Sequence, residues 1–244
     1  MFGEIFAGGD PVPVGIRSGD LIHGTHITGG AGTLEEQGRR ALNLLHTSVE
    51  AAGGTLDNVA QVSFFLAEPR PGMAALNTLW VDMFPKAEDR PTYKFMTAPL
   101  PSGCLVQLDY FAVLGARRRL LAVDGVAHTN PIPLGVAIGD YLFSSRILPN
   151  DPATGTVGPD APSQADLVFG NASKLLAAGG FAWRDVVQGR AFIAEDAYRP
   201  LVETQWKKNL GAAAERARLH HAVYAVAPTL RVMLEIFCGR SGAK

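Results

Sequence analysis

Histidines are the residues of this sequence that are best suited to proton transfer near neutral pH. His220 and His221 are adjacent, so in a strand their side chains point to opposite faces and one of them could face a cleft. His26 stands alone and could act as a general acid or base, although a lone histidine is more often structural. No further His, Cys or carboxylate stands at the spacing of a metal site, so we expect no bound metal.

Other motifs of catalytic sites are missing from the sequence. Gly29 to Thr33, GGAGT, resembles a phosphate loop only superficially, because it lacks the lysine and the spacing of a Walker motif. No Gly-x-Ser-x-Gly elbow and no Cys/His nucleophile pair with an orienting residue is present. These observations disfavour phosphoryl transfer and covalent catalysis.

The elements that must position these residues occur twice. The segment PVGIRSGDLIHGTHIT and the segment PLGVAIGDYLFSSRIL align without a gap at a separation of 120 residues, with matching glycines at Gly15 and Gly135. Ala-Ala-Gly-Gly recurs from Ala51 and Ala177, a shift of 177 − 51 = 126, and Trp80 and Trp206 match at the same shift. Because proline and glycine set turns, this agreement indicates a duplicated fold.

Each copy reads as strand–strand–helix–strand–helix–strand–strand. We predict an α/β protein of the α+β type, in which each copy is a mixed sheet with two helices packed on one face. The domains are predicted at residues 1–115 and 116–244, and residues 115–128 are expected to supply the first strand of the second copy. The sheet face without helices needs a partner, which predicts a homo-oligomer.

Composition narrows the classes of partner. Lys and Arg number 22 against 23 Asp and Glu, a net charge of −1, so we expect no nucleic-acid partner and no membrane partner. The only basic run, Arg117 to Arg119, is expected to be a solvated connector. The sequence start shows no signal-peptide pattern, and two cysteines fit free thiols, so we expect a cytoplasmic protein.

Motifs in both copies resemble the RidA/YjgF family of enamine and imine deaminases. The second copy carries GDYLFSSRILPNDPATG, VVQGRAFIAE and AERARL, and the first carries GDLIHGTHIT, EAAGGTLDNVAQVSFFLAE and LPSGCLVQLDYFAV. The resemblance implies trimeric, barrel-like assemblies with ligand clefts between neighbouring units. It also implies hydrolysis of reactive imines and enamines such as 2-aminoacrylate, with release of ammonia and without a metal or cofactor.

The resemblance also suggests roles for single residues. Arg218 matches the arginine that forks onto the substrate carboxylate, whereas the first copy has Thr92 there (92 + 126 = 218). The glutamate credited with handling the attacking water falls on Met233 and Gln107, and neither can act as a base. The ligand-facing turn holds Ser145 and Arg146 in the second copy and Thr25 and His26 in the first.

Two functions remain open. The first is an enzyme that hydrolyses or tautomerises a small imine or enamine carboxylic acid. In it Arg218 binds the carboxylate, Ser145 orients water, and His26 or His220 carries the proton. Arg146, Thr25 and Gln107 are further candidates for substrate contacts, and a cleft that pairs both copies could set Arg218 opposite His26 or Gln107. The second is a non-catalytic unit that binds small carboxylates. In both, the partner is a small carboxylate-bearing molecule and the favoured assembly is a trimer.

Overall fold

The computed structural model describes residues 2–9, 12–67, 69–223 and 227–240. Its described residues divide into two compact units, of which the first lies within 2–119 together with Asn130–Ile132 and the second comprises Leu120–Thr129 together with residues from 133–240. Each unit contains one six-stranded sheet, so each is described by itself.

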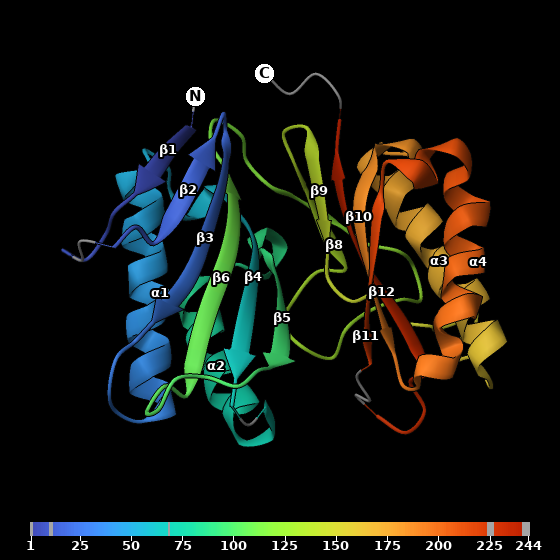
Figure 1. Ribbon diagram of the computed structural model, residues 1–244, viewed down its shortest axis with the longest axis horizontal. Coiled ribbons are helices and arrows are strands. Elements are labelled where there is room, and N and C mark those ends of the chain that lie inside the picture. The colour runs from blue at the N-terminus through green and yellow to red at the C-terminus, as the bar shows by residue number, and fades with distance from the viewer. Residues whose placement is uncertain (1, 10–11, 68, 224–226, 241–244) are drawn as a thin grey trace. The chain divides into compact units, whose positions relative to one another are not determined.

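In the first unit both helices lie on one face of the sheet (Figure 1). The strand order is β1-β2-β3-β6-β4-β5, in which β4 and β5 pair in parallel and the other neighbours are antiparallel. The helices are α1 (Leu34–Ala51) and α2 (Pro69–Met83). The strands are β1 (Phe2–Ile5), β2 (Gly15–Ser18), β3 (Leu21–Thr28), β4 (Val59–Leu66), β5 (Thr92–Thr97) and β6 (Val106–Val113).

The second unit repeats this topology strand for strand. Its order is β7-β8-β9-β12-β10-β11, with β10 and β11 in parallel, and its helices α3 (Ala161–Gly179) and α4 (Arg199–Leu210) again share one face (Figure 1). The strands are β7 (Arg119–Leu121), β8 (Gly135–Ile138), β9 (Tyr141–Ser144), β10 (Val186–Ile193), β11 (Arg218–Val223) and β12 (Val232–Gly239). The predicted fold is confirmed, as is the strand expected between residues 115 and 128. Strand β1 was not predicted.

Strand register shows which residues of the two units are equivalent. Gln61 on β4 is the partner of Thr92 on β5, and Gln188 on β10 is the partner of Arg218 on β11. Both glutamines follow a bulge against the neighbouring antiparallel strand. The equivalence of Thr92 and Arg218 predicted from the repeat is therefore confirmed by the sheets themselves.

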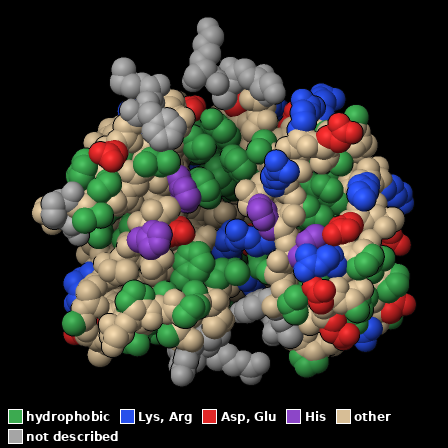
Figure 2. All heavy atoms as spheres, in the orientation of Figure 1, with side chains coloured by type: hydrophobic (Ala, Val, Ile, Leu, Met, Phe, Trp, Pro, Cys, Tyr) green, Lys and Arg blue, Asp and Glu red, His purple; other side chains and the backbone are tan. Residues whose placement is uncertain are grey.

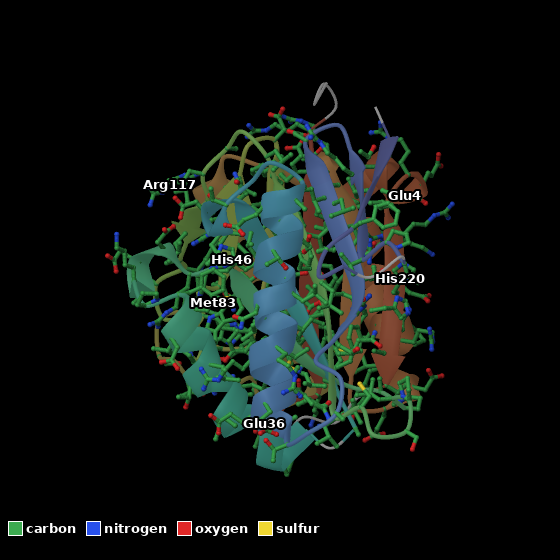
Figure 3. The ribbon with its side chains drawn as sticks, turned by 90° about the vertical axis from the view of Figure 1, so that its left-hand side faces the viewer. Glu4, Glu36, His46, Met83, Arg117 and His220 are labelled. Carbon is green, nitrogen blue, oxygen red and sulfur yellow. The ribbon has the colours of Figure 1, made fainter. Side chains whose placement is uncertain are left out.

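The first helix of each unit begins with the same device. Thr33 caps α1 and forms a capping box with Glu36, which lies at one end of that helix (Figure 3), and Asp160 caps α3 together with Ser163. Each box satisfies backbone N–H groups that have no partner inside the helix. Helix α3 ends with its C-cap at Gly180, the last residue of its Ala-Ala-Gly-Gly segment, whose φ of 74° is left-handed and favours glycine.

A buried glutamine then ties each helix to the loop before the last strand. The Nε2 group of Gln37 donates to the Gly103 carbonyl at 2.8 Å, and its Oε1 atom accepts from the Leu105 N–H at 2.8 Å. Gln164 donates to the Thr229 carbonyl at 2.7 Å and accepts from the Arg231 N–H at 2.7 Å. Since an unpaired buried amide is unfavourable, the two glutamines fix the path of these loops.

Alternation along the strands separates a core face from a second face in each sheet. On β12 the core residues are Val232, Leu234, Ile236 and Cys238, which pack with the helices. Met233, Glu235 and Phe237 therefore point to the opposite side, called here the helix-free face. On β6 the equivalent residues of the helix-free face are Gln107, Asp109 and Phe111, since Val106, Leu108, Tyr110 and Ala112 belong to the core. That the helix-free faces pack against a partner stays a prediction.

The basic run at the end of the first unit differs from expectation. Arg118 is only 6% exposed, and its guanidinium donates to the carbonyls of Asp89 at 2.8 Å and Val59 at 3.2 Å. The prediction of a solvated connector is therefore wrong for Arg118, because its guanidinium donates hydrogen bonds to carbonyl groups of the first unit. Arg117 is exposed and pairs with Asp89 at 3.2 Å.

We expect Gly189→Ala to destabilise the second unit. A Cβ atom at Gly189 would lie 2.4 Å from Cζ3 of the buried Trp206 ring, so the ring or the strand would have to shift. Such overpacking typically lowers the free energy of unfolding by about 1–3 kcal/mol. Denaturant unfolding provides the measurement. Gly170→Ala in α3 is the control, because nothing lies within 4 Å of its added Cβ, and it should be neutral or stabilising. Equal effects of the two changes would contradict this packing.

Candidate functional site

Two of the predicted site residues, Arg218 and His220, lie on strand β11 and point to the helix-free face of the second unit. Leu219 packs against the core, and the His221 Nε2 atom lies 3.9 Å from Glu203 Oε1 on helix α4. Because side chains alternate along a strand, those of Arg218 and His220 point to the face opposite to Leu219 and His221. Both residues are exposed, and His220 is labelled in Figure 3. The prediction that the two histidines face opposite sides is confirmed.

The neighbouring strand β10 adds a residue that sequence reasoning missed. Gly189 lies against Trp206 on the helix side, so Gln188 and Arg190 point to the helix-free face. Arg190 is half-buried and is the register partner of His220. Within the described ranges, neither the Arg190 nor the Arg218 guanidinium forms a hydrogen bond or an ion pair. Two guanidinium groups and an imidazole thus lie side by side on this face, an arrangement that favours an anionic ligand.

Ser145 belongs to a second, more deeply buried group. Its hydroxyl lies 2.9 Å from the Leu134 carbonyl and 2.6 Å from Nε2 of His128. Burial, together with the positive charge of Arg146, lowers the pKa of His128 to about 4. The imidazole is therefore neutral at physiological pH, and it hydrogen-bonds a serine that has no exposed surface.

Arg146 is held in place beside this pair. Its Nε atom lies 3.9 Å from Glu235 Oε1, and its guanidinium carbon lies 4.3 Å from the centroid of the Phe192 ring. The side chain of Arg146 is 14% exposed. The Glu235 carboxylate and the Phe192 ring together offset the free-energy cost of burying the Arg146 guanidinium. The positive charge of Arg146 is therefore largely balanced by groups of its own unit.

The first unit has different side chains at the equivalent positions. The Thr25 N–H donates to the Val14 carbonyl at 3.0 Å, as the Ser145 N–H does to the Leu134 carbonyl at 2.9 Å. His26 is exposed, has a φ of 56°, and its N–H donates to Asp109 Oδ1 at 3.0 Å. An asparagine or glycine would take this left-handed conformation more readily than histidine.

Gln107 and Thr92 complete the residues of the first unit that the sequence indicated. Gln107 on β6 pairs in register with Thr28 and Phe65 on the helix-free face. Thr92 is fully buried, and its hydroxyl donates to the Ala60 carbonyl and accepts from Gln61, each at 3.3 Å. At the position of Arg218, the first unit therefore offers no cation.

The strand order separates Arg218 from Ser145 within one unit. Arg218 begins β11 and Ser145 follows β9, and strands β10 and β12 lie between them. At a strand spacing of about 4.8 Å, the two main chains are about 14 Å apart. A small substrate held by Arg218 therefore does not reach Ser145 of the same unit.

The described part of the chain shows no group of three or more His, Cys, Asp or Glu residues that could hold a metal ion. Over that same part, no helix is long and apolar enough to cross a membrane. On the face drawn in Figure 2, Lys and Arg side chains are interspersed with Asp and Glu over the second unit, so charge of one sign does not dominate that view.

Residues 127–238 match the family model described as Endoribonuclease L-PSP. The second unit of this chain belongs to that family. This confirms the resemblance to the RidA/YjgF family, and the shared strand order of the first unit fits a tandem duplication of the L-PSP family fold. Family membership supports a RidA-like function in general terms.

Several solved structures are similar to about half of this chain. A putative endoribonuclease from Thermotoga maritima is 24% identical, covers 51% of this chain and 98% of its own, and has a TM-score of 0.45. RidA from an Antarctic Psychrobacter is 20% identical over 50% of this chain and 99% of its own, with a TM-score of 0.47. The YjgF gene product of E. coli is 21% identical, covers 50% of this chain and 99% of its own, and has a TM-score of 0.43. Among curated proteins, no sequence matches.

Proposed function

We propose that the second unit hydrolyses a small imine or enamine carboxylic acid and releases ammonia. The observation that carries this proposal is the exposed Arg218 guanidinium on the helix-free face, without an ion partner in the described ranges and with His220 on the same face. A guanidinium binds a carboxylate through two parallel hydrogen bonds, which would fix the substrate in one orientation.

The proposed reaction needs a proton donor and a water. Protonation of the imine nitrogen makes the imine carbon electrophilic. Water then adds to that carbon, and the resulting carbinolamine breaks its C–N bond to give a keto acid and ammonia. His220 is the candidate for the proton transfers, since it lies two residues along the strand from Arg218 on the same face. If Ser145 also orients the water, it would have to come from a neighbouring chain, in line with the predicted trimer.

The second candidate is a unit that binds carboxylates without catalysis. It is favoured by Met233 and Gln107, which occupy the positions where the family resemblance implies a catalytic glutamate. Glu235 lies two residues further along β12 on the same face, but its carboxylate lies beside Arg146. The carboxylate site of Arg218 is common to both candidates, so turnover is what distinguishes them.

The test is ammonia release from freshly generated 2-aminoacrylate and related imines. Acceleration by the purified protein, at cytoplasmic pH and without added metal, would support the enzyme. Binding of a keto acid by calorimetry without any acceleration would support the binding unit instead. Light scattering adds a test of the trimer, because a stable monomer near the chain mass of 25.9 kDa would contradict it.

A further inference from the structure

We infer that the ligand of the second unit is a dianion, with one carboxylate held by Arg218 and a second by Arg190. This inference rests on the proposed carboxylate site and narrows its substrate class to short dicarboxylic imines and their keto-acid products. It concerns binding, so it can be tested apart from turnover.

The first argument is placement. Arg190 and Arg218 lie on adjacent parallel strands and on the same face, because Arg218 is the register partner of Gln188 and Arg190 comes two residues after Gln188. A strand spacing of about 4.8 Å and a rise of about 3.3 Å per residue set their Cα atoms about 8 Å apart. Two long, flexible side chains at this separation can each bind one end of a short dicarboxylate.

The second argument is charge. The nearest acid across the sheet from Arg190 is Glu235, its register partner on β12. The Glu235 carboxylate lies 3.9 Å from the Arg146 guanidinium, and the described residues contain no ion pair between Glu235 and Arg190. Two permanent positive charges thus stand on adjacent strands without an acid between them. A monoanion would neutralise one of them, whereas a dianion neutralises both.

The third argument is comparison within the chain. Ser63 is the register partner of Asp109 in the first unit, as Arg190 is of Glu235 in the second, so Ser63 and Arg190 are equivalent. Thr92 is equivalent to Arg218. Both arginines are therefore replaced by neutral hydroxyl residues in the same copy. The two arginines occur together or not at all, which is the pattern expected of groups that bind one ligand.

Calorimetry with stable keto acids tests the inference on the full chain. The parent protein should bind 2-oxoglutarate at least about tenfold more tightly than 2-oxobutyrate, a difference of about 1.4 kcal/mol. Arg190→Gln should remove this preference. It should lower the affinity for 2-oxoglutarate about tenfold or more and leave the affinity for 2-oxobutyrate within about twofold of the parent value. Arg184→Gln is the matched control, because the Arg184 side chain is 80% exposed in the turn Trp183–Asp185 before β10 and should change neither affinity.

Several outcomes would overturn the inference. Equal affinity of the parent protein for 2-oxoglutarate and 2-oxobutyrate would do so. An Arg190→Gln variant that loses affinity for both keto acids by the same factor would do so as well. Inorganic phosphate that binds more tightly than 2-oxoglutarate would assign the two arginines to a phosphate group instead. A preference for 2-oxoglutarate that depends on Arg190 in a protein without imine turnover would leave the dianion site intact and reject only the enzyme.

Discussion

Arg218→Ala is expected to lower kcat/KM for imine hydrolysis steeply. The substitution leaves the substrate carboxylate without its charged partner at the site. Losing one partner of a hydrogen-bonded charge pair that becomes buried when the substrate binds typically costs about 2–5 kcal/mol. Since about 1.4 kcal/mol corresponds to a factor of ten, the expected loss is roughly thirty-fold to several thousand-fold. Arg218→Lys should recover only part of it, because an ammonium lacks the planar fork of a guanidinium.

The duplicated chain offers a control at the equivalent position. Thr92→Ala changes the first unit at the residue that corresponds to Arg218, where the structure has no cation. It should leave turnover within about twofold, the range expected when no charge interaction with the substrate is lost. Full activity in Arg218→Ala would show that the site assignment is wrong and that the first unit carries the chemistry. Ammonia release under identical imine supply is the measurement for all three variants.

A second large effect is expected in the pH dependence of stability, and it depends on His128. Above pH 6.5 the histidine is neutral in both the folded and the unfolded chain. Between pH 6.5 and about 4 the unfolded chain binds a proton that the folded chain does not, because burial has lowered the folded pKa to about 4. The free energy of unfolding should therefore fall as the pH drops through this window, by about 3 kcal/mol in total.

His128→Gln isolates this contribution. Glutamine does not titrate, and its Nε2 group can still donate to the Ser145 hydroxyl, so the difference in stability between parent and variant should shrink or reverse as the pH falls from 7 to 4. The pKa values of His23 and His221 are also lowered by burial, but these residues are present in both proteins and cancel in the comparison. A His128 imidazole that titrates near pH 6.5 in an NMR experiment would contradict the buried pair.

Much of the fold and part of the site could be predicted from the sequence because they leave periodic signals. Matching prolines and glycines defined the repeat, and alternation along β11 separated His220 from His221. Arg190 could have been found by the same alternation, but its closeness to Arg218 depends on strand register, which no local pattern specifies. Glu235 is equivalent to Asp109 by strand register, and its contact with Arg146 depends on side-chain placement, which no local pattern specifies either.

His128 was missed for a different reason. It lies in the connector, and the repeat shift of 120 puts Gly8 at the corresponding position, so the comparison of copies contains no signal for it. The buried glutamines Gln37 and Gln164 were also missed, because glutamine is usually a surface residue. Their partners are backbone groups of the loops before β6 and β12, which are distant in the sequence. Long-range hydrogen bonds of this kind become visible only once the chain is folded.

The position of strand β7 determines where this chain tolerates being cut. Although it lies in the connector, β7 is the outermost strand of the second sheet and covers one side of β8. A fragment that starts at Leu120 would keep most of that cover. A fragment that starts at Leu134 would instead present the backbone donors and acceptors of β8 to solvent, which is a template for pairing with another chain. A truncation inside the connector would therefore turn a well-behaved unit into one that self-associates through an exposed strand.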